Sequence, residues 1–82
     1  MTRDAIFAVV KDNILKVLPE VCPAAISLEK SLVELGANSV DRVEVAMYSM
    51  EALKLKIPRI ELHGVRNLAD LVDLFHAHLR GE

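Results

Sequence analysis

The chain has 82 residues, of which 52% are hydrophobic and 27% are charged, and its formal net charge is −2. A chain this short forms one small domain, so we expect residues 1–82 to be a single domain with little room for a deep enzyme pocket. The interspersed charges give no basic face for nucleic acid, and no apolar run is long enough to span a membrane. Because no secretory signal pattern follows Met1, we expect a cytoplasmic location.

The cysteine and histidine residues argue against a disulfide-bonded fold and against a metal site. Cys22 is the single cysteine, which excludes an internal disulfide, and we expect it to be a small buried side chain. His63 stands apart, and His76 and His78 are two residues apart, so they would point to different sides of a helix. No zinc set, catalytic nucleophile motif or phosphate-binding loop is present. The sequence therefore predicts that the chain is not an enzyme and holds no metal.

The first predicted helix runs from about Arg3 to Leu18, with Thr2 as its N-cap and Pro19 marking its end. Its core face is marked by apolar residues at helical spacing: Ile6, Val9, Val10, Ile14, Val17 and Leu18. Residues 19–37 form a long connection. In it we expect three leucines to pack on the core, and Gly36 to occupy a turn or a position with positive φ. These leucines are Leu28, Leu32 and Leu35.

The second helix is expected from about Ser39 to Leu55, ending before Pro58. A short helical turn follows at about Arg59 to Leu62 and ends by Gly64. The last helix is expected from Leu68 to Leu79, with Asn67 as its N-cap and Arg80-Gly81 as its ending. Because no segment alternates as a strand would, the sequence predicts an all-α fold, a small bundle of three main helices plus one short helix.

The second helix carries two apolar stripes at about 100° per residue. One stripe suits contact with the other helices and consists of Val45, Ala46, Ser49, Ala52 and Leu53. The other consists of Val40, Val43, Met47 and Met50, flanked by Asp41, Glu44 and Glu51. One helix of a small bundle rarely buries both sides, so the second stripe is a candidate docking surface. The alternative is that Met47 or Met50 reaches the core and the rest is scattered surface apolarity.

Ser39 begins this helix and has two interpretations. Serine near a helix start commonly caps it, because the hydroxyl accepts a hydrogen bond from a free backbone N–H. No histidine is adjacent in sequence to act as a general base, so Ser39 is not a self-activated nucleophile. If Ser39 reacts, another enzyme must supply the base.

The segments "LVELGANSVDRVEVAM", "LKIPRIEL" and "NLADLVDLFHAHL" together resemble the acyl carrier proteins of fatty acid and polyketide synthesis. The resemblance covers about Leu32 to Leu79 and centres on the family motif G-x-D-S-[LV], matched here by Gly36, Ser39 and Val40. It implies that Ser39 carries 4′-phosphopantetheine, attached from coenzyme A by a magnesium-dependent phosphopantetheinyl transferase. The usual motif aspartate is Asn38 here, which keeps the capping ability but loses a charge that the transferase or its metal could use.

A narrower resemblance is to the discrete donor carriers of polyketide β-branching cassettes, suggested by Arg42 and by "IPRIEL". It implies a free-standing monomer that receives malonyl from an acyltransferase. A decarboxylating ketosynthase-like enzyme would convert malonyl to acetyl, and the carrier would donate acetyl to an HMG-CoA-synthase-like enzyme. The expected partner-binding residues are Val40, Asp41, Arg42, Val43, Glu44, Met47, Met50, Arg59 and Ile60.

Two other functions stay open at this point. The chain could be a general carrier for fatty acid or polyketide chain extension, or an aminoacyl carrier. It could also be a helical interaction module that is never modified and in which Ser39 is a plain N-cap.

Overall fold

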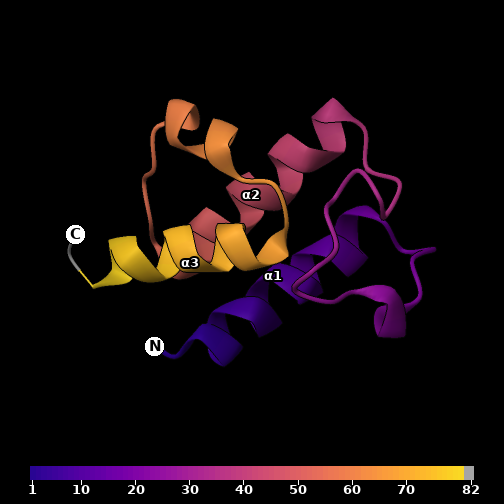
Figure 1. Cartoon of the computed structure of the whole chain (residues 1–82), viewed down its shortest axis with the longest axis horizontal. Helices are drawn as coiled ribbons and strands as arrows, with labels where there is room; N and C mark the ends of the chain where they lie inside the picture. The colour runs from indigo at the N-terminus through magenta and orange to yellow at the C-terminus, as the bar shows by residue number, and fades with distance from the viewer. Residues whose placement is uncertain (81–82) are drawn as a thin grey trace.

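The computed structural model describes residues 1–80 and contains three α-helices and two short 3₁₀ helices (Figure 1). The elements are α1 (Arg3–Val17), η1 (Pro23–Ala25), α2 (Ser39–Leu53), η2 (Arg59–Gly64) and α3 (Leu68–Leu79). Within residues 1–80 no β-strand is present, and the predicted all-α fold is confirmed. No helix among these residues is long and apolar enough to cross a bilayer. The expected Gly81 at the end of the last helix lies outside the described residues.

Two of the three long helices begin at the predicted caps. The Thr2 hydroxyl accepts a hydrogen bond from the Ala5 N–H at 3.1 Å, and Asn67 Oδ1 accepts one from the Asp70 N–H at 2.9 Å. Helix α1 ends at Val17, one residue earlier than expected, because Leu18 precedes a proline and is pushed out of the α region. Helix α3 has the predicted bounds.

Helix α2 ends at Leu53, two residues before the predicted end at Leu55. Lys54 adopts the left-handed conformation with φ 58°, and the Leu55 N–H donates to the Met50 carbonyl at 2.8 Å. This closure reverses the chain direction, as residues in the left-handed region commonly do at helix ends. The reversal allows Ile57, three residues on, to be buried in the core.

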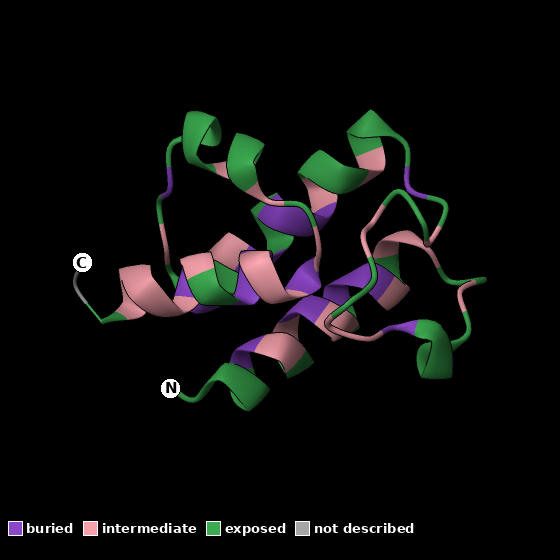
Figure 2. Ribbon diagram, viewed as in Figure 1, coloured by how far each residue is buried: buried purple, intermediate pink, exposed green. Residues whose placement is uncertain are grey.

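The core lies where α1 packs against both α2 and α3, and the buried parts of the helices face one another there (Figure 2). Its buried apolar side chains come from all three long helices and from two connections: Ile6, Val10, Ile14, Ile26, Val45, Leu53, Ile57, Leu68, Leu71, Val72 and Phe75. A buried polar pair lies among them, with Asn13 Nδ2 donating to the Ser49 hydroxyl at 3.4 Å and to the Val9 carbonyl at 3.0 Å. Asn13 is not among the residues predicted for the core face of the first helix.

Two burial predictions were wrong. Ala52 is exposed because it lies at the edge of the buried stripe of α2, about 20° from Val45 but about 100° from Leu53 and about 120° from Ala46 around the helix. Cys22 is also exposed, since the neighbouring Val21 packs against the core instead.

The long connection before α2 is anchored to the start of α3. The Leu28 and Lys30 carbonyls accept hydrogen bonds from the N–H groups of Ala69 and Leu68, both at 2.9 Å. Its three leucines pack against the core as predicted, and Gly36 has the predicted positive φ of 96°. The loop is therefore held on the surface of the bundle next to the α2 N-terminus.

Candidate functional site

Ser39 occupies the first helical position of α2 and is exposed. The N-cap is Asn38, whose Oδ1 accepts a hydrogen bond from the Asp41 N–H at 2.8 Å. In return, Asp41 Oδ2 accepts a hydrogen bond from the Asn38 N–H at 3.2 Å, which completes a capping box. The interpretation of Ser39 as the N-cap is therefore wrong. Within residues 1–80 its hydroxyl makes no hydrogen bond, so it is free to react.

The second stripe of α2 is largely exposed, as predicted. Relative exposures are 64% for Val40, 36% for Val43 and 56% for Met47. Met50 is half-buried and packs against the core, so the alternative interpretation holds for this one residue. Of the other expected partner-binding residues, Arg42, Arg59 and Ile60 are exposed, while Asp41 and Glu44 are half-buried.

A groove of about 540 Å³ opens beside Ser39, between α2, η2 and the start of α3. We call it the Ser39 groove. Helix α2 contributes Ser39, Arg42, Val43, Ala46, Met47 and Met50 to it. The rest of its wall comes from Ser31, Leu32 and Val33 of the preceding loop and from Arg59, Leu62, His63, Val65, Arg66, Asn67, Leu68 and Leu71. Five expected site residues on α2 and η2 thus meet Ser39 in one hollow, whereas Val40, Asp41, Glu44 and Ile60 lie outside its lining.

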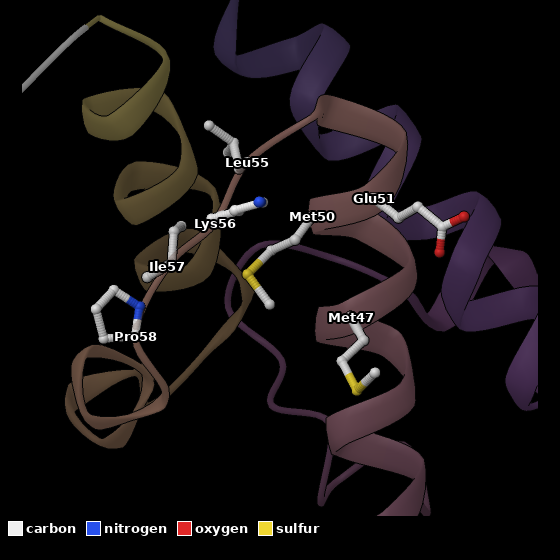
Figure 3. Close-up of a pocket in the computed structure, with 7 residues that line it drawn as sticks. All are labelled: Met47, Met50, Glu51, Leu55, Lys56, Ile57 and Pro58. Carbon is white, nitrogen blue, oxygen red and sulfur yellow. The ribbon is translucent and has the colours of Figure 1, made fainter.

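A second, shallower hollow of about 500 Å³ adjoins the same stripe and shares Met47 and Met50 (Figure 3). The Met50 side chain extends from α2 toward the segment that carries Ile57 and Pro58 (Figure 3). The flexible thioether side chains of the two methionines therefore separate the two hollows with adaptable apolar surface.

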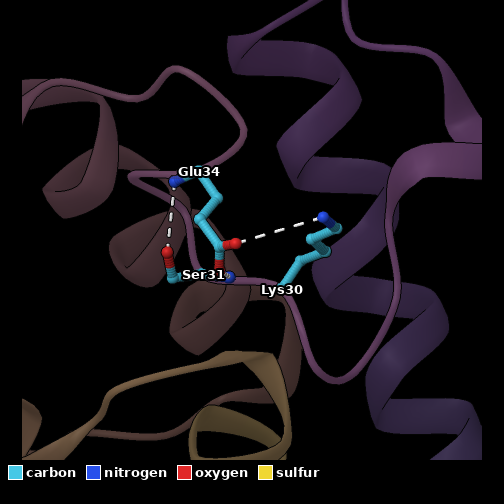
Figure 4. A network of polar contacts seen from close by, with 3 residues as sticks. All are labelled: Lys30, Ser31 and Glu34. Carbon is cyan, nitrogen blue, oxygen red and sulfur yellow. Dashed lines mark hydrogen bonds and ion pairs between the residues drawn. The ribbon is translucent and has the colours of Figure 1, made fainter.

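The loop wall of the Ser39 groove is braced by a local polar network (Figure 4). The Ser31 N–H donates to Glu34 Oε1 at 2.9 Å, and the Glu34 N–H donates to the Ser31 hydroxyl at 3.1 Å. The backbone hydrogen bond from Ser31 is the main cause that lowers the pKa of the Glu34 carboxyl. The Ser31 hydroxyl and the Lys30 ammonium act in the same direction. The two hydrogen bonds between Ser31 and Glu34 hold Ser31, which lines the groove, to the next turn of the loop.

Sequence reasoning missed two sets of side-chain contacts. His78 Nε2 lies 2.9 Å from Glu61 Oε1, and this contact joins α3 to η2. Tyr48 donates its hydroxyl to Glu44 Oε2 at 3.3 Å, and the Lys16 ammonium lies 5.8 Å from its ring centroid. Within residues 1–80 no cluster of three histidine, cysteine or carboxylate side chains could hold a metal ion. The pairing of His78 with Glu61 connects elements far apart in sequence, so no local pattern could have revealed it.

Residues 8–75 match the family model of the phosphopantetheine attachment site. The chain belongs to the phosphopantetheine-binding acyl carrier protein family. It is a carrier that holds its cargo on 4′-phosphopantetheine rather than a catalyst.

Similar proteins agree with this assignment. The polyketide biosynthesis acyl-carrier-protein AcpK of Bacillus subtilis (strain 168) is 47% identical over 76 residues, which cover 93% of each chain. The acyl carrier protein of Campylobacter fetus subsp. fetus (strain 82-40) is 36% identical over 70 residues, which cover 84% of this chain and 90% of the relative.

The fold also matches a chain in the crystal structure of the curacin biosynthetic pathway HMG synthase in complex with acetyl donor-ACP. The TM-score is 0.86 and the sequence identity 39%, over 94% of this chain and 99% of that chain. The predicted carrier fold is thereby confirmed.

Proposed function

We propose that Ser39 is the attachment point of 4′-phosphopantetheine. In the transfer reaction the Ser39 oxygen forms a bond to the phosphorus of the pantetheine phosphate of coenzyme A. The pyrophosphate bond breaks, the nucleotide part leaves, and the hydroxyl proton passes to a base of the transferase. The observation that carries the proposal is that Asn38 and Asp41 already cap the helix, which leaves the exposed Ser39 hydroxyl unused within residues 1–80.

The chain contributes position and access to this reaction rather than acid–base chemistry. At the first position of α2 the attached phosphate lies near the N-terminal backbone N–H groups, where a negative charge is stabilised. Asn38 caps this end without adding a second negative charge close to the phosphate. The magnesium ion and the base belong to the transferase.

Incubation with a promiscuous phosphopantetheinyl transferase, magnesium and acetyl-coenzyme A, followed by intact mass measurement, tests this assignment. Wild type should gain one acetyl-phosphopantetheine group, and Ser39→Ala should gain none. Ser31→Ala is the matched control, because Ser31 lines the same groove and should leave loading intact. Loading of the Ser39→Ala variant would refute the assignment. If wild type takes no load, the Asn38→Asp variant is tested next. Loading of that variant would mean that Asn38 blocks this transferase, and no loading would mean that the assigned site is wrong.

The second part of the proposal is that the carrier holds acetyl and donates it to an HMG-CoA-synthase-like enzyme in polyketide β-branching. The support is the similarity in fold and sequence to the chain in the HMG synthase complex and to a polyketide carrier. Acetyl would arise on the arm from malonyl. A malonyl acyltransferase and a decarboxylating ketosynthase-like enzyme are then the preceding partners. The monomeric state and the cytoplasmic location stay predictions.

The partner surface in this proposal is the exposed stripe of α2 together with Arg59 and Ile60 of η2. Ile60 is 75% exposed and Met47 56%, and two arginines, Arg42 and Arg59, stand among these apolar side chains. A small apolar patch with a charged rim suits transient contact, in which charge governs partner choice and association rate more than affinity.

A general role in chain extension is the second candidate, favoured by the 36% identity to the Campylobacter acyl carrier protein. Transfer of acetyl to a purified HMG-CoA-synthase-like enzyme, in competition with transfer to a chain-extending ketosynthase, separates the two. A preference for the ketosynthase would exclude the donor role.

A further inference from the structure

The Ser39 groove has an unusual charge for this chain. Its wall contains Arg42, Arg59, His63 and Arg66, and no aspartate or glutamate of residues 1–80 lines it. The chain as a whole has a net charge of −2, so cationic groups are concentrated at this hollow. The remaining wall is mainly apolar, with Leu62, Val65, Leu68 and Leu71 among its side chains.

The cations of the groove are only partly paired. Within residues 1–80 neither Arg42 nor Arg59 forms an ion pair. Arg66 Nε lies 3.6 Å from Asp70 Oδ2, but the Arg66 side chain is 88% exposed and the contact is long. Guanidinium groups present several N–H donors suited to bidentate binding of a carboxylate. The groove thus offers donors to an anion.

The phosphodiester of the arm accounts for only one of these groups. Arg42 lies three residues after Ser39 and so on the same face of α2, where it can neutralise a phosphate attached to Ser39. The other two arginines and His63 belong to η2 and to the segment that leads into α3. A second anion, carried at the acyl end of the arm, would be the group that meets Arg59 and Arg66.

We infer that the Ser39 groove binds the free carboxylate of a dicarboxylic acyl group carried on the chain's own arm, with Arg59 and Arg66 as its partners. The inference rests on the proposed attachment at Ser39. The apolar wall would contact the neutral part of the acyl chain, and the arginines would contact the carboxylate at its end. Because the ligand is tethered, its effective concentration is of order millimolar, so a weak contact suffices to populate the docked state.

This binding would distinguish cargo before and after decarboxylation. Loss of carbon dioxide from a malonyl thioester breaks one carbon–carbon bond, and the resulting carbanion takes a proton to give acetyl. The acetyl group has no carboxylate, so the contact with Arg59 and Arg66 is lost and the arm is released. A carrier waiting for decarboxylation would then hold its arm docked, and a carrier ready to donate acetyl would extend it.

The test compares malonyl with acetoacetyl, which has nearly the same shape but no charge. Isotope-labelled protein is loaded at Ser39 with each group from its coenzyme A thioester, the load is verified by intact mass, and backbone amide spectra are recorded. We expect malonyl, but not acetoacetyl or acetyl, to shift the amides of residues 59–68. The shifts should vanish near ~1 M salt, where the screening length is about 3 Å.

Variants separate the groove from general charge effects. Arg59→Gln combined with Arg66→Gln should abolish the malonyl-specific shifts. Lys56→Gln, a cation lining the other hollow, should leave them unchanged. Equal shifts with acetoacetyl would mean that the groove binds by apolar contact alone, and shifts already present in the unacylated form would assign the anion to the phosphodiester. Either result, or loaded protein without any shift, overturns the inference and leaves the proposed function standing. Protein that takes no load at Ser39 overturns both.

Discussion

Asn38 and Asp41 exchange two hydrogen bonds across the first turn of α2, at 2.8 and 3.2 Å, and Ser39 lies between them without taking part. The sequence allowed two roles for Ser39, helix cap and attachment point. In the structure, Asn38 is the cap and Ser39 has the free hydroxyl. One residue stabilises the helix end, and the next presents a free hydroxyl. The division predicts that stability and modification respond to different substitutions.

Asn38→Ala should lower the free energy of unfolding by about 0.5–2 kcal/mol, because the N-cap is lost and the Asp41 N–H loses its partner. Ser39→Ala should change it by less than about 0.5 kcal/mol, as expected for an exposed side chain that makes no hydrogen bond within residues 1–80. Urea denaturation of the unmodified proteins measures both. Asn38→Asp is the control that keeps an acceptor at the cap. A loss with Ser39→Ala as large as that with Asn38→Ala would contradict the capping geometry.

Lys54→Gly should raise the free energy of unfolding by up to about 1 kcal/mol, because the left-handed region is unfavourable for a residue with a Cβ and readily adopted by glycine. Ala52→Gly provides a control of opposite sign. Ala52 is exposed inside α2, where replacing alanine by glycine should lower the free energy of unfolding by about 0.5–1 kcal/mol. Thermal or urea unfolding of the two variants gives the comparison. If both substitutions destabilise equally, Lys54 does not end the helix in the way described.

Glu34 should add an acid-sensitive contribution to stability. Its pKa lies below the usual value of 4.5 in the folded chain, so its stabilising contribution is present above that pH and is lost as the pH falls through the folded pKa. Glu34→Gln should therefore destabilise the protein at neutral pH and differ less from wild type in acid. Urea midpoints across this range measure the effect, with Glu29→Gln as the control from the same loop. If the difference in stability between Glu34→Gln and wild type does not become smaller in acid, the Glu34 carboxylate does not stabilise the folded chain in this way.

Arg59→Glu should slow acetyl transfer to an HMG-CoA-synthase-like enzyme by roughly ten-fold at low ionic strength, because a rim charge that steers association is reversed. Loading of Ser39 by the transferase should be unchanged. Transfer rates measured at several salt concentrations test this, and the difference should shrink as salt rises. Lys56→Glu makes the same charge change on the neighbouring hollow and serves as the control. If the variant loses loading and transfer equally, or loses neither, Arg59 is not a recognition residue for the synthase.

Much of the secondary structure followed from local rules. Thr2 and Asn67 cap α1 and α3 as predicted, and Gly36 has its positive φ. These features depend on residues within one turn of each other, so a single sequence contains the information. The end of α2 did not follow, because it depends on burying Ile57 in a core built from distant segments.

The candidate site divides in the same way. Ser39 and the exposed stripe of α2 were expected from the motif and from helical periodicity, since both lie on one continuous helix. Cys22 and Ala52 were placed wrongly, because which of two adjacent residues turns inward depends on the packing of the neighbouring segments.

The sequence by itself determined the family, the number of long helices and the position of the serine within its motif. Only the tertiary structure decided that Asn38 rather than Ser39 caps α2. It also brought Arg59, His63 and Arg66 to the same groove as Ser39. The physical reason is that a helical repeat describes one element at a time. The groove instead exists where η2 and the start of α3 are held near α2 by the packing of the common core.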